Sequence, residues 1–188
     1  MMENGIVLYE SRYGAAKQYA EWIGETLDLP VKKCSELAAW ELAAYDFIVA
    51  GSSIYMGKTL IRNWLTQNAA SLADKKLLLY IVGAAPALQK AKTDKYFTDN
   101  VPATLLKAGN CFYLQGKSIY NELSFTDRLF LKIGAWLAQK SEDKKAMLTD
   151  FNEVKRSNLF PLLNALNVLL YRQVKTNNGQ QVIKQVAA

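Results

Sequence analysis

Apolar, β-prone segments recur along the chain with helical patterns between them, and this alternation limits the fold more than any other feature. The segments are Ile6–Tyr9, Pro30–Val31, Asp46–Ser53, Lys76–Pro86 and Asn110–Lys117. Strands that alternate with helices are typical of a parallel sheet with helices on both faces. The third and fourth segments are almost wholly apolar, as strands buried on both faces should be. We therefore predict an α/β fold with a doubly wound, five-stranded parallel sheet.

Helical patterns fill the intervals between the predicted strands. Apolar residues fall on one face of Ala15–Leu27 at spacings of three and four, and a second helix is predicted from about Leu60 to Asn68. A third helical stretch lies between the fourth and fifth strands. A final helix is predicted over Ser157–Asn167.

The chain length suits one compact domain with an appendage, since 188 residues of which 51% are hydrophobic can bury a core. We assign residues 1–168 to the domain and residues 169–188 to a C-terminal tail. Asn178-Gly179 lies between β-prone segments of the tail, which predicts a hairpin with a type I′ turn. A helix that runs into a frayed end is the alternative. The tail could also seal a homodimer.

Residues 117–152 read as an insertion near the last strand, and within them Ser124–Lys140 form an amphipathic helical pattern. Ser124 and Asp127 resemble a capping box, in which the Ser124 hydroxyl accepts the Asp127 amide hydrogen. The apolar stripe consists of Phe125, Leu129, Ile133, Trp136 and Leu137, with Arg128, Lys132 and Lys140 off it. Packing of this stripe on the sheet is favoured, because amphipathic helices usually serve the core. A lid or a membrane-facing surface is the alternative.

The chain contains no histidine, and this excludes histidine-based triads, imidazole general bases and most zinc sites. Cys34 and Cys111 have no CxxC or metal-ligand spacing, so we expect buried free thiols without a disulfide. Any redox chemistry should then belong to a bound cofactor.

The net charge of +6 is compatible with an ordinary soluble surface or with an anionic partner. Lysines are scattered, no nucleic-acid motif accompanies them, and nucleic-acid binding is not expected. No run reaches the roughly 18 apolar residues of a membrane-spanning helix, and the N-terminus lacks a secretory signal. A cytoplasmic protein is expected.

Three permissive turns follow the first, third and fourth strands, where ligands bind in open α/β sheets. Ser11–Ala16 can direct backbone amides and the start of a helix at a phosphate. Ser52–Gly57 places small hydroxyl residues and Tyr55 between glycines, which suits the edge and face of a flat ring. Gly83–Pro86 is small and uncharged, so a planar ligand can lie against it.

The segments ILYESRYGAAKQYAEWI, DFIVAGSSIYMGK and KLLLYIVGAAP resemble the flavodoxin-like fold, especially its branch of bacterial quinone-coupled protoporphyrinogen oxidases. The resemblance covers roughly Gly5–Asn167 and includes the basic, aromatic insertion. It implies the strand order 2-1-3-4-5 and an FMN cofactor. It also implies that the FMN phosphate is held by Ser11, Arg12, Tyr13, Gly14, Ala15 and Ala16, and the isoalloxazine ring by Ser52, Ser53, Ile54, Tyr55, Met56 and Gly57 with Gly83, Ala84, Ala85 and Pro86.

One departure concerns the phosphate loop, which in this family is usually rich in Ser and Thr. Ala15 and Ala16 occupy its last two positions here, so Ser11, the backbone amides, and Arg12 or Lys17 remain to hold the phosphate. Each absent hydroxyl removes a hydrogen bond of about 1.5 to 3 kcal/mol to a charged acceptor, so we expect weaker FMN binding than in a dedicated carrier.

The resemblance implies an FMN-dependent oxidoreductase in which the flavin carries the chemistry and no side chain is singled out as catalytic. Protoporphyrinogen is the candidate substrate and a quinone the candidate acceptor, with peripheral membrane contact through residues 124–140. An electron carrier for redox partners is an alternative, although such carriers are typically acidic around the flavin. A flavin-less interaction protein and a nicotinamide-dependent quinone reductase are further alternatives.

Overall fold

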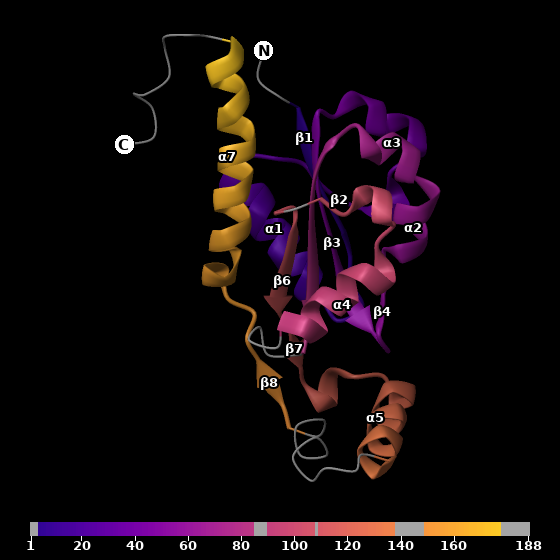
Figure 1. Ribbon diagram of the computed structural model, residues 1–188. Helices are drawn as coiled ribbons and strands as arrows, with labels where there is room; N and C mark the ends of the chain where they lie inside the picture. Colours follow the sequence, from indigo (N-terminus) through magenta and orange to yellow (C-terminus); the bar gives the residue numbers. More distant parts are fainter. Residues whose placement is uncertain (1–3, 85–89, 108, 138–148, 178–188) are drawn as a thin grey trace.

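The computed structural model describes residues 4–84, 90–107, 109–137 and 149–177, and its centre is a parallel β-sheet (Figure 1). The sheet runs in the order β2-β1-β3-β5-β6, and all four strand pairings along this path are parallel. Counted along the chain, this is the predicted order 2-1-3-4-5. The strands are β1 (Gly5–Glu10), β2 (Val31–Lys33), β3 (Phe47–Tyr55), β5 (Lys76–Gly83) and β6 (Cys111–Gln115).

Helices cover both faces of the sheet, so the predicted doubly wound α/β fold is confirmed (Figure 1). The α-helices are α1 (Ala15–Leu27), α2 (Arg62–Gln67), α3 (Ala69–Ala73), α4 (Lys90–Asn100), α5 (Phe125–Leu137) and α7 (Phe160–Asn177). Short 3₁₀ helices are η1 (Cys34–Glu36), η2 (Ala39–Ala44), η3 (Ala103–Leu105), η4 (Tyr120–Glu122) and η5 (Arg156–Leu159).

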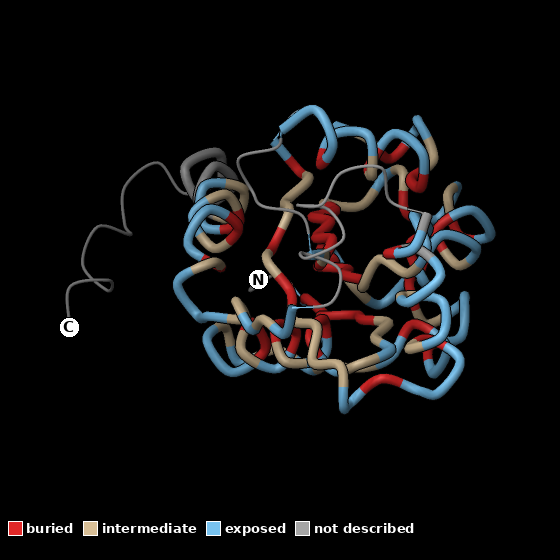
Figure 2. Tube along the Cα trace, turned by 90° about the horizontal axis from the view of Figure 1, so that it is seen from below, coloured by how far each residue is buried: buried red, intermediate tan, exposed pale blue. Residues whose placement is uncertain are grey.

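The core lies on the two faces of the sheet because successive strand residues point to opposite sides. Val7 and Val49 belong to the cluster that includes residues of α1 and α7. Ile6 and Ile48 belong to the other cluster, with residues of α2, α3 and α4. In Figure 2 the buried residues gather along the strands and the inner sides of the helices. Both faces are therefore covered around the central strands, as their apolar sequences predict.

Some element bounds differ from the sequence-based ones for local reasons. β3 continues to Tyr55 because β4 (Lys58–Thr59) folds back on it antiparallel, and β4 is too short to show a sequence period. The predicted helix from Leu60 to Asn68 is divided into α2 and α3. Asn68 leaves helical geometry at φ −105° and ψ 10°, while its side chain donates a hydrogen bond to the Trp64 carbonyl.

The segment 117–152 leaves the sheet as a separate unit at its carboxyl edge (Figure 1). β7 (Lys117–Ser118) pairs antiparallel with β8 (Phe151–Asn152), which brings the two ends of the segment together. The Asp127 amide donates to the Ser124 hydroxyl over 3.2 Å, so the predicted cap of α5 is present. The expectation that its apolar stripe packs on the sheet is wrong. Phe125 is 75% exposed and Trp136 is 76% exposed.

The C-terminal tail differs from the predicted hairpin. α7 continues through Asn177, so the residues expected to form the first strand before Asn178-Gly179 are helical. The tail boundary after residue 168 also falls inside this helix. The turn itself and residues 178–188 lie outside the described part of the chain. Self-association through the tail stays a prediction.

The cysteines are free thiols, Cys34 buried and Cys111 half-buried. Burial raises the pKa of the Cys111 thiol to about 11, so little thiolate forms at neutral pH. Neither cysteine is therefore a candidate nucleophile. Among the described residues, no helix is both long and apolar enough to span a membrane.

Candidate functional site at the carboxyl edge of the sheet

A cavity of about 370 Å³ opens at the carboxyl edge of the sheet, where the three predicted turns meet. The turns after β1, β3 and β5 all contribute to it, as expected for parallel strands that end at one edge. The predicted site residues that line it are Arg12, Tyr13, Ala15, Ser53, Ile54, Tyr55, Met56, Gly83 and Ala84.

The other predicted site residues have different surroundings. Ala16 and Ser52 are fully buried, and the Ser52 hydroxyl donates to the Ser53 carbonyl and accepts from the Ile61 amide. Ser52 therefore stabilises the turn from inside the protein and does not line the cavity. Ala85 and Pro86 lie outside the described residues.

The turn after β1 has the geometry of an anion cradle. Gly14 has a φ of 83° and caps α1 without a side chain, and the first helical hydrogen bond runs from Gln18 to the Gly14 carbonyl. The amides of the first helical turn consequently have no side-chain cap, and the positive end of the helix lies there. A Cβ on Gly14 would meet no atom within 4 Å, so glycine is needed for its backbone conformation rather than for space.

Ser11 supplies the observation by which a phosphate can be tested against this loop. Its hydroxyl oxygen is buried and has no hydrogen-bond partner among the described residues. A buried hydroxyl without a partner is costly, and an anionic oxygen in the loop would satisfy it. The residues present therefore fit a phosphate, even though Ala15 and Ala16 add no hydroxyl.

The turn after β3 is a tight hairpin formed with β4. Met56 and Gly57 have φ values of 50° and 78°, the signs that a type I′ turn requires at both central positions. Asn100 fixes this turn from α4, because its side chain accepts from the Thr59 amide at 2.9 Å and donates to the Gly57 carbonyl at 3.1 Å. Asn100 is 2% exposed, so it holds the hairpin from inside the molecule.

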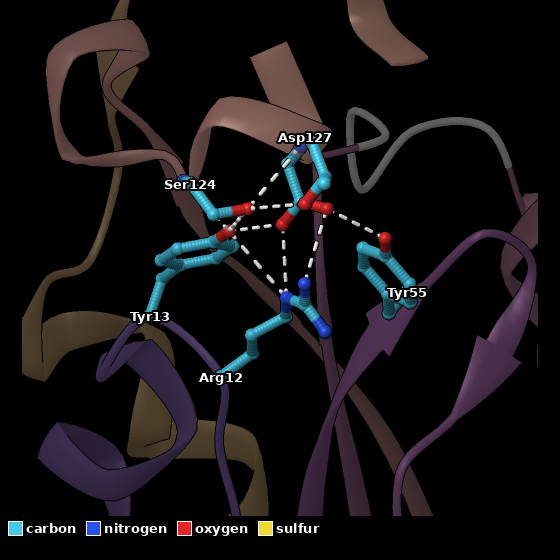
Figure 3. Close-up of polar contacts among 6 residues, drawn as sticks. Arg12, Tyr13, Tyr55, Ser124 and Asp127 are labelled. Atoms are coloured by element: carbon cyan, nitrogen blue, oxygen red, sulfur yellow. Dashed lines mark hydrogen bonds and ion pairs between the residues drawn. The ribbon is translucent and has the colours of Figure 1, made fainter. Parts of the chain in front are cut away.

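A polar cluster joins two of the turns to α5, and Asp127 is its centre (Figure 3). Arg12 donates to both carboxylate oxygens of Asp127, from Nε at 2.9 Å and Nη2 at 3.1 Å. The hydroxyl of Tyr55 donates to Asp127 Oδ1 at 2.6 Å, and that of Tyr13 donates to Oδ2. The Ser124 amide donates to the Tyr13 hydroxyl at 3.2 Å. The Arg12 guanidinium also lies 4.1 Å from the centre of the Tyr55 ring.

The cluster sets the protonation of its members. Burial raises the pKa of Asp127, but hydrogen bonds from Tyr13, Tyr55 and Arg12 outweigh it and hold that pKa below its ordinary value. The hydrogen bond to Asp127 raises the pKa of Tyr55. At neutral pH the cluster thus contains an ionised carboxylate beside the Arg12 guanidinium and the protonated phenol of Tyr55.

Sequence reasoning missed the part of the site that α5 contributes. Asp127 was expected only as part of a helix cap, and it is 5% exposed at the centre of the cluster. Lys117, Leu123, Phe130 and Leu131 also line the cavity. The one available signal was that Asp127 is a lone acid in a basic, apolar helix. Its partner Arg12 lies 115 positions away in the sequence, so their contact leaves no local pattern.

Comparison with known proteins identifies the family of the chain. A family model described as a flavodoxin domain matches residues 6–145. No curated protein matches the chain.

Solved structures with similar architecture include a flavodoxin from the domain Archaea, at 21% identity with a TM-score of 0.42, covering 63% of this chain and 87% of that one. Flavodoxin 2 from Bacillus cereus has 19% identity and a TM-score of 0.43 over 60% of this chain and 84% of its own. A flavoprotein in complex with FMN from Lactobacillus acidophilus has 15% identity and a TM-score of 0.37 over 60% and 92%.

The family match concerns the flavodoxin domain as a whole, so the narrower resemblance to protoporphyrinogen oxidases stays a proposal. Because the family model matches most of the chain, the chain belongs to the flavodoxin domain family, and FMN is its cofactor.

Proposed function

We propose that this protein is an FMN-dependent oxidoreductase that works against an anionic membrane surface and delivers electrons to a quinone dissolved in the lipid. The observation that carries the proposal is an exposed apolar face on α5, directly beside the cavity. This apolar face of α5 consists of Phe125, Leu129, Phe130, Ile133 and Trp136, each between 44% and 76% exposed.

The orientation of α5 is the reverse of that of an ordinary amphipathic helix. Its inward side carries Asp127 and Ala135, which are 5% and 1% exposed, and its outward side carries the large aromatic and aliphatic residues. Contiguous exposed apolar surface of this kind marks an interaction site. Lys132 adjoins the apolar face, and aromatic residues beside cations are the pattern of a helix that lies in a lipid interface.

The apolar face reaches the cavity through Phe130, and the next residue of α5, Leu131, also lines the cavity. FMN, when bound, supplies one- and two-electron chemistry. The loop after β1 would hold its phosphate, while Tyr55 and Gly83 would hold its ring. Phe130 and Leu131 would exclude water on the side where a lipid-soluble acceptor arrives.

Protoporphyrinogen is the substrate to test first. The cavity wall carries Lys117, which pairs with Glu122 at 2.8 Å, and the net charge of +6 suits a substrate with two carboxylates. Each turnover would remove two electrons and two protons from the substrate and convert one quinone to the quinol. The support for this substrate is charge and the sequence resemblance alone.

A flavodoxin-type electron carrier is the second candidate, and the family match favours it. The net charge of +6 opposes it, since an acidic surface is what steers a carrier onto basic partners. The two functions differ in where the protein acts, because a carrier has no need of a lipid surface.

The test is co-sedimentation of the FMN-loaded protein with phosphatidylglycerol-containing vesicles and with phosphatidylcholine vesicles. We expect binding to the anionic vesicles, and loss of that binding in the double variant Phe125→Ser/Trp136→Ser. Phe160→Ser is the matched control, because Phe160 is 65% exposed on α7, outside the insertion. Equal vesicle binding by both variants, or none by the wild type, would reject the membrane role. Quinol formation from porphyrinogen then tests the reaction.

A further inference from the structure

Arg12 is held by an anion that is not the cofactor. Its guanidinium makes two hydrogen bonds to Asp127, and its side chain is 38% exposed while that of Asp127 is 6% exposed. Paired donors on a carboxylate are among the strongest contacts a guanidinium makes in proteins, and a phosphate offers the same geometry. The Arg12 guanidinium can therefore pair with either of two anions, the Asp127 carboxylate or a phosphate.

The position of Arg12 conflicts with a bound flavin in one respect. The guanidinium lies 4.1 Å from the centre of the Tyr55 ring and so covers one face of it. Tyr55 lines the cavity, and its ring is expected to receive the isoalloxazine. Arg12 also belongs to the loop whose uncapped amides and buried Ser11 hydroxyl fit a phosphate. A move of the guanidinium from Tyr55 toward that phosphate would resolve the conflict.

We propose that Asp127 is a positioning residue that competes with the FMN phosphate for Arg12. Without FMN, the insertion is tied to the phosphate loop through Asp127 and Arg12. With FMN, the guanidinium pairs with the phosphate, Tyr55 is uncovered, and the Asp127 carboxylate keeps the hydrogen bonds from Tyr13 and Tyr55. This inference rests on the proposed FMN function.

Competition for one guanidinium makes FMN and the insertion thermodynamically linked. A change at Asp127 that weakens its contact with Arg12 must strengthen FMN binding, and FMN must weaken that contact by the same factor. The phosphate loop lacks hydroxyls at Ala15 and Ala16, so Arg12 is one of the few side chains left in it that can donate hydrogen bonds to a phosphate. The position of α5 thereby regulates how tightly the cofactor is held.

The test is FMN affinity, measured by quenching of flavin fluorescence, in Asp127→Asn. Asparagine keeps the shape and can still accept hydrogen bonds from the tyrosines, but it releases Arg12. We expect FMN binding about tenfold tighter than in the wild type, the value of one charged hydrogen bond. Glu25→Gln is the control, because it removes the same charge from the Arg156 pair at the opposite end of α1 and should leave affinity unchanged.

A double-mutant cycle separates competition from simple charge repulsion between Asp127 and the phosphate. In an Arg12→Gln background, competition predicts that Asp127→Asn no longer changes FMN affinity, whereas repulsion predicts the same gain as before. Hydrogen exchange gives a second readout, since FMN should speed exchange of the α5 amides in the wild type and change it little in Asp127→Asn.

The outcomes are distinguishable. If the wild type binds FMN and Asp127→Asn binds it no more tightly, or if the gain persists without Arg12, the competition is rejected and the proposed function stands. If neither protein binds FMN, the proposed function is rejected together with the inference.

Discussion

The conformation of the phosphate loop depends on one residue, Gly14, which caps α1. Its φ of 83° lies in the left-handed region, and an added Cβ would meet no atom within 4 Å. Gly14→Ala should therefore lower the free energy of unfolding by about 1 kcal/mol through backbone strain alone. The helix start would shift with it, and FMN affinity should fall. Gly109 has a φ of 80° and the same free space, but it lies just before β6, away from the turn after β1. Gly109→Ala should cost the same stability in urea unfolding and leave FMN affinity unchanged.

Asp127 predicts a pH dependence whose sign follows from its lowered pKa. A carboxylate whose folded pKa lies below its unfolded value stabilises the fold fully above the unfolded value, about 3.9, and loses this contribution as the pH falls toward the folded value. The difference in unfolding free energy between wild type and Asp127→Asn should be constant above about pH 5 and shrink below about pH 4. A difference that grows on acidification would contradict the ionised state of the cluster.

At the scale of elements, the β3–β4 hairpin depends on Asn100 at the end of α4. Asn100→Ala leaves the Thr59 amide and the Gly57 carbonyl without their side-chain partner, which should cost about 1 to 3 kcal/mol of stability and reduce FMN affinity. Asn110 is similarly buried and makes its hydrogen bonds to the Leu77 and Leu105 carbonyls before β6 begins, away from the cavity. Asn110→Ala should cost similar stability without changing FMN affinity. An equal loss of affinity in both variants would show that hairpin geometry is not involved.

Sequence predicted the elements whose patterns are local and failed where the pattern is ambiguous. The central strands are visible as continuous apolar runs because they are buried on both faces, and α1 is visible because burial on one face imposes a helical period. The apolar stripe of α5 has the same period whether it faces a core or a membrane, so the sequence pattern could not predict that the stripe is exposed. β4, β7 and β8 are two-residue strands, too short for any period. The contact of Asp127 with Arg12 depends on tertiary structure alone.

At the scale of the whole molecule, the net charge of +6 and the apolar face of α5 should act together on a membrane. Raising the salt from about 0.1 to about 1 M shortens the screening length from about 10 to about 3 Å, so binding to anionic vesicles should weaken severalfold. The apolar contribution should persist, leaving residual binding that Phe125→Ser/Trp136→Ser removes. Binding that is indifferent to both salt and this variant would contradict the membrane surface assigned to α5.

We place FMN in the cavity between the three turns and α5. The most direct measurement is the absorption spectrum of the purified protein during titration with FMN. We expect flavin bands that shift and saturate at one FMN per chain, with flavin fluorescence quenched as the ring meets Tyr55. A spectrum equal to the sum of free FMN and protein at every ratio would contradict it.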